Sequence, residues 1–213
     1  MARFVFEKDQ LRFAICRSRV RRILGQYTQT SPHDIAFTTI GRDKPVLAGD
    51  NPRSIEFNLS HTDGLACLAV THGAAVGVDL EAMRAVKDEF IVYSLNQAEH
   101  TSILSLDSTE REAAFLRHWT AKEAYLKALG TGLWQSLKTF DVDVPLTSAP
   151  GKFVRGSLPR IDDPAERARQ WHLYTFAPTG RHVGALACAP PEGTAINIRR
   201  RWISTPPASI LNA

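Results

Sequence analysis

Two acidic side chains alternate with apolar ones in Gly77-Val78-Asp79-Leu80-Glu81, and this alternation constrains the local fold. The residues just before it are also apolar and β-branched, with one short break, which favours strands over a helix. Successive side chains of a strand project to opposite faces. The pattern therefore predicts that Asp79 and Glu81 share one face, while Val78 and Leu80 point into a core.

Two carboxylates about 5 Å apart repel each other by roughly 3 kcal/mol at an effective dielectric constant near 20. A cation between Asp79 and Glu81 would reverse the sign of that interaction. Hard oxygen ligands in this number suit Mg²⁺, which usually keeps several waters and completes its octahedron with substrate phosphates. The alternative is an exposed strand edge that carries two solvated acids.

A second segment has a strong helix pattern with signals at both ends. Residues 107–109 offer N-cap candidates, and Thr109 with Glu112 has the spacing of a capping box. Gly130 is a natural stop at the C-terminal end of the segment. The pattern predicts one long helix between these two points.

Within this helix Trp119, Glu123 and Lys127 recur every four residues, so they lie on one face. An ordinary surface pair of Glu123 with Lys127 beside a core tryptophan would give the same spacing. Thr120 with Glu123 also matches a capping box, which would restart the helix there.

Taken together, four blocks in this order and spacing resemble the 4'-phosphopantetheinyl transferases of the larger, surfactin-synthetase-activating type. The blocks are residues 43–45 (Asp-Lys-Pro), 57–62 (Phe-Asn-Leu-Ser-His-Thr), 77–81 and 119–127. The resemblance extends from about Phe4 to Pro190. It implies an enzyme that moves the 4'-phosphopantetheine arm of coenzyme A onto a serine of an acyl, aryl or peptidyl carrier protein and releases 3',5'-ADP.

The chain also shows faint internal similarity that agrees with the fold implied by the resemblance. Residues 55–70 and 171–189 each read as a hairpin, with turns at 62–64 and 178–180. We therefore expect an α+β fold of two pseudo-symmetric lobes, each an antiparallel sheet packed with helices. The expected division is an N-terminal lobe at 1–73, a C-terminal lobe at 74–190 that carries the metal and catalytic residues, and a loosely attached tail at 191–213.

The resemblance also implies roles for individual acidic and basic residues. Asp79, Glu81 and Glu123 would bind Mg²⁺, with Mn²⁺ as a possible substitute, and the pyrophosphate of coenzyme A would fill further positions. Lys127 would face the α-phosphate and stabilise charge on the leaving 3',5'-ADP. Glu123 or Glu99, directly or through a water, would take the proton of the carrier serine; the sequence leaves this choice open.

Three further residues resemble nucleotide contacts of the family. Ser60 and His61 would hold the 3'-phosphate of coenzyme A, and Lys44 would support the nucleotide phosphates as a point charge. A structural hydrogen-bonding histidine and a solvated loop lysine are the alternatives for His61 and Lys44. Asp43 stands where the family often has glycine, and Thr62 stands where serine is usual.

Composition is compatible with this interpretation and narrows the partners. The 213 residues are 44% hydrophobic, contain no apolar run long enough for a membrane span, and begin without a secretory signal pattern, so we expect a cytoplasmic protein. The three cysteines, an odd number scattered among apolar neighbours, are expected to be reduced core residues. The family usually carries a further segment with basic residues ahead of the Phe4 position. Its absence here indicates a naturally short start, a late start codon or a trimmed sequence, and it leaves fewer coenzyme A contacts that can be named.

The net charge of +4 is unevenly placed, with five arginines between positions 12 and 22. They alternate with apolar residues in a way that predicts an amphipathic helix ending near Gly25. Carrier proteins are generally acidic, so such a basic face fits that partner, although a plain solvated face fits equally well. No nucleic-acid motif accompanies the arginines, and both lobes in one chain favour a monomer.

Two other functions would use similar residues. A magnesium-dependent hydrolase of nucleotide pyrophosphates would need no protein acceptor. A non-catalytic carrier-protein or nucleotide binder would have kept the lobes and lost the chemistry, but the acids at 79, 81 and 123 with Lys127 argue against that loss.

Overall fold

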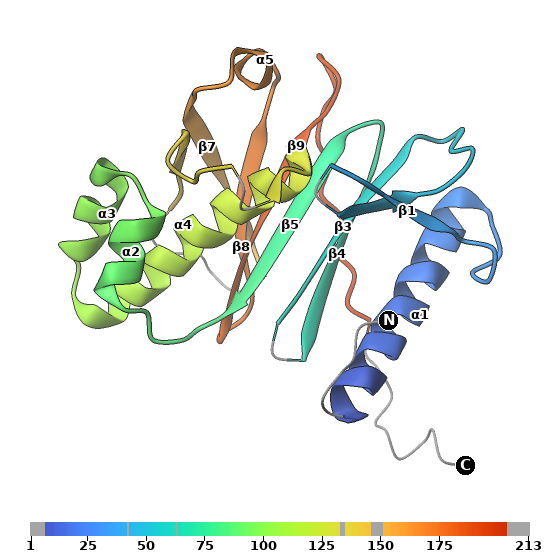
Figure 1. The fold of residues 1–213 in the computed structure, drawn as a ribbon, viewed down its shortest axis with the longest axis horizontal. Coiled ribbons are helices and arrows are strands. Elements are labelled where there is room, and N and C mark those ends of the chain that lie inside the picture. Colours follow the sequence, from blue (N-terminus) through green and yellow to red (C-terminus); the bar gives the residue numbers. More distant parts are fainter. Residues whose placement is uncertain (1–6, 42, 63, 133–134, 146–150, 204–213) are drawn as a thin grey trace.

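In the fold, one long helix lies across a five-stranded antiparallel sheet, and a helix with two hairpins lies beside it (Figure 1). This computed structural model describes residues 7–41, 43–62, 64–132, 135–145 and 151–203, with side chains from residue 13 onward. The described helices are α1 (Glu7–Thr28), α2 (Asp88–Ser94), α3 (Gln97–Leu104), α4 (Ser108–Leu129) and α5 (Pro164–Arg167). The described strands are β1 (Phe37–Ile40), β2 (Lys44–Leu47), β3 (Ile55–Thr62), β4 (Leu65–His72), β5 (Ala75–Ala82), β6 (Phe140–Asp143), β7 (Phe153–Ile161), β8 (His172–Thr179) and β9 (His182–Ala189).

The large sheet has the order β5-β9-β8-β7-β6, and α4 covers one of its faces (Figure 1). The contact of α4 with β5 and β9 is made of small residues. Ala121 and Ala124 of α4 share a buried cluster with Ala185 and Ala187 of β9. Gly77 of β5 lies opposite Ala187 in the register and lets the helix backbone come close to the sheet.

On the opposite face of the sheet, Val78 and Leu80 of β5 are buried in a cluster with Phe176 of β8. Leu65 and Cys67 of β4 pack against this cluster. The predicted alternation along residues 77–81 is therefore confirmed, with the apolar side chains in a core and the acids on the face beneath α4.

β3 runs alongside β5, and side chains link the two strands (Figure 1). The Val78 N–H donates to Asn58 Oδ1 at 2.9 Å, and the Leu80 N–H donates to Ser60 Oγ at 3.2 Å. Asn58 and Ser60 are two residues apart, so they reach the same edge of β5 from one face of β3. These bonds satisfy buried backbone donors that a neighbouring strand would otherwise pair.

Both predicted hairpins are present. β3 pairs with β4 and β8 pairs with β9, both antiparallel. Asp63, the centre of the first predicted turn, lies outside the described residues, as does Arg42 of the turn before Lys44.

Two sequence expectations about helix ends need correction or refinement. α1 continues past Gly25 to Thr28, and Gly25 instead permits a close approach of the Thr30 carbonyl, which would lie 2.6 Å from a Cβ at this position. Of the N-cap candidates at 107–109, Asp107 caps α4, so the helix does not begin with the capping box of Thr109 and Glu112.

Three of the four buried clusters lie on one side of the expected division of the chain. One, which contains Leu24, Ile35 and Phe57, draws only on residues before 73, and two others draw only on residues after 74. The fourth joins Leu65 and Cys67 of β4 to Val78 and Leu80 of β5 and so crosses the division. We propose a lobe boundary between β4 and β5, with this fourth cluster as the contact between the lobes. The described part of the tail, residues 191–203, is mostly exposed.

The contact beneath α4 leads to a prediction about Gly77. A Cβ at this position would lie 2.0 Å from the Ala124 carbonyl oxygen and 2.4 Å from the Ala128 nitrogen, both of which are backbone atoms. Gly77→Ala should therefore lower the free energy of unfolding in urea by at least about 2 kcal/mol.

Gly180→Ala is the matched control, since a Cβ there would meet nothing within 4 Å. Equal urea midpoints for the two variants would show that the close contact of α4 with β5 is wrong.

Candidate active site

The long helix α4 carries two of the predicted site residues, Glu123 and Lys127, on the face that meets β5. Asp107 caps its start by accepting hydrogen bonds from the backbone N–H groups of Thr109 and Glu110, and Gly130 ends it in the left-handed region at φ 77°. The helix is continuous through Thr120, so the predicted alternative of a restart at that residue is wrong. Glu123 and Lys127 therefore lie one turn apart above β5.

Asp79 of β5 is the centre of the site and is only 5% exposed. Its Oδ1 accepts hydrogen bonds from Lys127 Nζ at 2.6 Å and from Ser60 Oγ at 3.0 Å. Its Oδ2 is buried and has no hydrogen-bond partner. One side of this carboxylate is thus neutralised by an ammonium, and the other side is free to bind a further positive group.

Glu123 is buried beside Asp79, and its Oε1 has no hydrogen-bond partner either. Burial first, and then the charge of Asp79, raise the pKa of Glu123 to about 7, while Lys127 opposes the shift and Glu81 adds to it. Asp79 and Glu81 of β5 are thus both close enough to raise the pKa of Glu123, so the three acids lie in one region.

Glu81 lies at the more open end of the trio and is half-buried. Burial, and then the charge of Asp79, raise the pKa of the Glu81 carboxyl. Arg84, whose Nη2 lies 3.6 Å from Glu81 Oε2, and a hydrogen bond from Trp119 act in the opposite direction and lower this pKa. Trp119 also packs against Phe90 and so forms a wall beside Glu81. These contacts fix the orientation of the carboxylate.

Within the described residues, the acids do not form a closed coordination group of three or more His, Cys, Asp or Glu side chains. The ammonium of Lys127 stands against Asp79 as the local cation. Oxygen donors with unpartnered buried atoms are nevertheless the set that a hard divalent ion prefers. The donor chemistry of these residues therefore fits such an ion, and binding it would require Lys127 to turn away and the carboxylates to draw closer together.

The comparisons with known proteins decide the family. Residues 75–187 match the family described as the 4'-phosphopantetheinyl transferase superfamily, and residues 1–73 match the family described as 4'-phosphopantetheinyl transferase, N-terminal. The chain belongs to the 4'-phosphopantetheinyl transferase superfamily.

Several curated relatives of this transferase are similar over most of its length. The 4'-phosphopantetheinyl transferase HetI of Nostoc is 33% identical over 88% of this chain and 74% of its own. The L-aminoadipate-semialdehyde dehydrogenase-phosphopantetheinyl transferase of Xenopus laevis is 28% identical over 86% of this chain and 64% of its own. The chain therefore spans about three quarters of the first relative and less than two thirds of the second.

A solved structure overlaps more weakly with the transferase. The holo-(acyl-carrier-protein) synthase of Bacillus anthracis has 20% sequence identity and a TM-score of 0.41, over 54% of this chain and 94% of its own. An overlap of this size carries no conclusion about the site.

Of the two residues predicted to hold the 3'-phosphate, Ser60 lies in the site of the transferase and His61 does not. Ser60 is buried between Asp79 and the Leu80 N–H, and Lys127 Nζ lies 3.3 Å from its hydroxyl. His61 is the next residue on β3, so it projects to the other face, where it is exposed. The structure does not bring the two predicted phosphate contacts together.

Lys44 does not have the free ammonium that the sequence predicted. It is only 6% exposed, and its Nζ donates to the carbonyls of Ala128 at 2.8 Å and of Val76 at 3.2 Å. The predicted role as a point charge that supports the nucleotide phosphates is therefore corrected to a structural one. A positive charge at the last turn of α4 also complements the helix dipole, and it ties that turn to β5.

Glu99 lies apart from the acid cluster, which corrects its predicted candidacy as the base. It completes a capping box with Asn96 at the start of α3, and its Oε1 accepts from the Val142 N–H at 3.0 Å. Its Oε2 pairs with the buried ammonium of Lys122 at 2.9 Å. All of these partners are structural, and none belongs to the acid cluster.

Two residues whose contacts hold β5 and α4 in position were not predicted from the sequence. Asn58 links β3 to β5, and Lys122 is wholly buried on α4. Asn58 stands two residues before Ser60 and could have been assigned to the same strand face. Lys122 offers no such signal, since a lysine beside a glutamate on a helix usually indicates a solvated surface.

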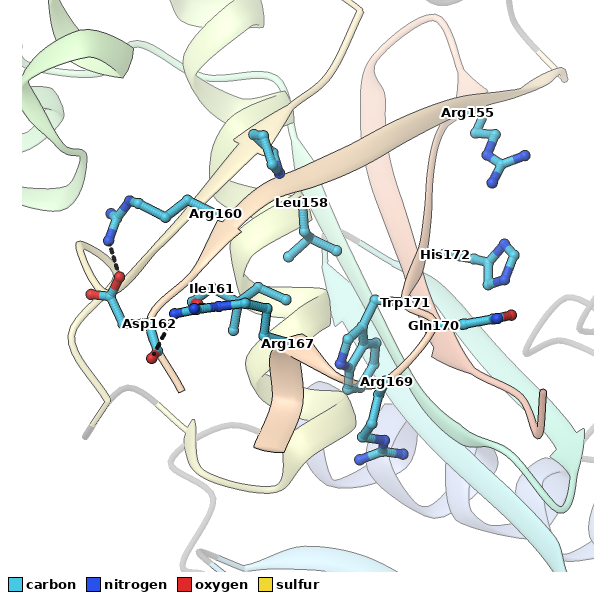
Figure 2. A pocket seen from close by; sticks show the side chains of 11 residues that line it. Arg155, Leu158, Arg160, Ile161, Asp162, Arg167, Arg169, Gln170, Trp171 and His172 are labelled. Carbon is cyan, nitrogen blue, oxygen red and sulfur yellow. Dashed lines mark hydrogen bonds and ion pairs between the residues drawn. The ribbon is translucent and has the colours of Figure 1, made fainter. Parts of the chain in front are cut away.

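A surface hollow of about 730 Å³ is not part of this site (Figure 2). It lies along β7 and α5, and three of the four arginines that line it have partners. Arg160 pairs with Asp141 and Asp162, and Arg169 pairs with Glu166. Arg167 donates to the Ile161 carbonyl, so these guanidinium groups serve the local fold.

The raised pKa of Glu123 predicts how stability depends on pH. In the folded protein the Glu123 carboxyl keeps its proton up to about pH 7, whereas in the unfolded chain it loses the proton near pH 4.5. The free energy of unfolding therefore falls as the pH rises between these two values. In metal-free buffer, Glu123→Gln should therefore raise the melting temperature at pH 8 by on the order of 5 °C. The gain should shrink toward zero near pH 4.5.

Glu192→Gln, which removes an exposed tail carboxylate, is the control and should change the melting temperature little at either pH. A Glu123→Gln variant that is less stable than the parent at pH 8 would contradict the burial of a costly charge at this position.

Proposed function

We propose that this chain transfers the 4'-phosphopantetheine moiety of coenzyme A to a serine of an acyl, aryl or peptidyl carrier protein and releases 3',5'-ADP. We further propose that it belongs to the larger, surfactin-synthetase-activating type, because both an N-terminal and a C-terminal family match lie on this one chain. The observation that carries the proposal is the acid cluster of buried Asp79 and Glu123 with half-buried Glu81, beside Lys127.

The acid cluster is the proposed metal site, for Mg²⁺ or in its place Mn²⁺. Asp79 Oδ2 and Glu123 Oε1 are buried oxygens without a partner, and Glu81 is held nearby by Trp119 and Arg84. When bound, such an ion supplies charge neutralisation for a pyrophosphate and polarises the phosphorus under attack.

Lys127 is the residue that would respond to the ion. Its ammonium is 28% exposed and reaches both Asp79 and Ser60, so its tip is accessible to solvent. A divalent ion on Asp79 would repel this ammonium. Lys127 would then turn toward the phosphate of the leaving 3',5'-ADP and stabilise the charge that develops there.

The carrier serine loses a proton as its oxygen forms a bond to the β-phosphorus of coenzyme A and the bond to the leaving phosphate breaks. Glu99 is committed to Lys122, so the proposed acceptor is Glu123 or a water that it orients. Much of the acceleration would come from holding the serine and the pyrophosphate in line within the site.

The proposal also covers the oligomeric state of the protein, its location and its partners. All of the proposed site residues lie on one chain, which fits a monomer. None of the helices in the described ranges is both long and apolar enough to cross a bilayer. We propose action in the cytoplasm on a protein partner, without nucleic acid.

Loss of one cluster oxygen should abolish transfer. Asp79→Asn keeps the size of the side chain and removes the charge, so we expect at least a hundredfold slower gain of phosphopantetheine mass on an apo carrier protein, at unchanged far-UV circular dichroism. Glu192→Gln is again the control.

Full holo-carrier formation by Asp79→Asn would refute the metal assignment. Release of 3',5'-ADP at the same rate without any carrier would instead indicate a nucleotide pyrophosphate hydrolase. Binding of coenzyme A or carrier without any product in the unmodified protein would indicate the non-catalytic binder.

Lys127→Ala should separate catalysis from metal binding. We expect kcat to fall about a hundredfold, because leaving-group charge loses its stabilisation, while the Mg²⁺ affinity changes less than tenfold. An equal loss of both quantities would mean that Lys127 serves only as the ion-pair partner of Asp79.

A further inference from the structure

Lys122 is the most deeply buried charged group among the described residues, at 0% exposure in the middle of α4. Its ammonium donates to the carbonyls of Leu137 and Phe140, both at 2.7 Å, and to Glu99 Oε2 at 2.9 Å. All three of its N–H donors are therefore used. The ammonium also lies 4.7 Å from the centre of the Phe140 ring.

A buried ion pair of this kind is not needed for stability alone. Desolvation of two charges is costly, and well-packed apolar residues of similar volume often replace such a pair without loss. Burial lowers the pKa of Lys122, which reflects that cost, although Glu99 opposes the shift. A lysine here is better explained by the directional bonds that it makes.

These bonds connect α4 to the far side of the C-terminal lobe. Glu99 accepts from the Asn96 and Val142 backbone N–H groups, and Asn96 donates to Asp141. Asp141 in turn pairs with Arg160 of β7, which lines the hollow in Figure 2. The network thus joins α4 to α3, β6 and β7.

The packing of α4 on the sheet gives a reason for such a network. On the side of β5 and β9 the contact is made by small residues, with Ala121, Ala124 and Ala128 against Gly77, Ala185 and Ala187. On another side of the helix Tyr125 packs against Phe140, with ring centres 4.6 Å apart. The small side chains form shallow ridges and grooves, so the β5 side of the helix adds little to what fixes its rotation. Hydrogen bonds to fixed carbonyls are directional and define that rotation.

We propose that Lys122 is a positioning residue that fixes the rotation and height of α4, and so sets Glu123 and Lys127 opposite Asp79. Lys122 and Glu123 are neighbours about 100° apart around the helix, so one anchors toward β6 while the other faces β5. The role rests on the function proposed above, but it acts on the geometry of the metal site, which can be measured without turnover.

The test compares Lys122→Met with Glu99→Leu, made together, against the parent. Removing both charges leaves no stranded ion in the core, and methionine fills the space of the lysine stem. We expect the urea midpoint to stay within about 1 M of the parent. The Kd for Mn²⁺, followed by electron paramagnetic resonance, should rise about 10- to 100-fold, and kcat should fall by a similar factor.

Lys138→Met is the matched control, because it removes an exposed lysine that bonds only to the Val92 carbonyl. Its Mn²⁺ affinity and kcat should equal those of the parent. A folded double variant with parental Mn²⁺ affinity and parental kcat would overturn the positioning role.

If the double variant does not fold, the single variant Glu99→Gln tests the positioning role instead. It keeps the bonds of Lys122 to the Leu137 and Phe140 carbonyls and weakens only its ion pair with residue 99. We expect a rise of at least threefold in the Mn²⁺ Kd, and an unchanged Kd would overturn the proposal. Failure of the parent itself to bind Mn²⁺ or to modify a carrier would instead overturn the proposed function.

Discussion

The close contact of α4 with β5 at Gly77 is the constraint on which the site depends. The helix backbone lies where a Cβ of residue 77 would be, and only glycine permits this approach. The approach brings Glu123 and Lys127 over Asp79 and Glu81, although the two segments are far apart in the sequence. The cost of gathering three acids in a buried place is offset in part by Lys127, and the unpartnered oxygens show that the offset is incomplete.

The junction between β3 and β5 extends this constraint to the N-terminal part of the chain. Asn58 and Ser60 satisfy two backbone N–H groups of β5, and Ser60 also donates to Asp79. Lys44 ties the last turn of α4 to the start of β5. The N-terminal part therefore helps to hold the strand and the helix that carry the acids, and this gives a physical reason why both parts occur together.

Much of this arrangement could be predicted from sequence because it follows from local rules. Alternation placed Asp79 and Glu81 on one face, helical spacing placed Glu123 and Lys127 on another, and Gly130 marked the end of α4. The assignments of Lys44 and Glu99 as site residues failed for different reasons. Lys44 bonds to carbonyls far away in the chain, and no local pattern shows such burial. Glu99 stands three residues after Asn96, and this capping-box spacing is a local signal of a structural role, although its pairing with Lys122 is not.

The central claim is that Asp79, Glu81 and Glu123 bind one divalent ion after Lys127 has moved aside. A crystal structure of the protein with Mn²⁺ and coenzyme A, with anomalous scattering recorded from manganese, tests this claim most directly. The account predicts a single strong peak within about 2.5 Å of an oxygen of each carboxylate, with Lys127 turned toward a phosphate. A structure that contains bound coenzyme A but shows no peak there, with Lys127 still paired to Asp79, would contradict it.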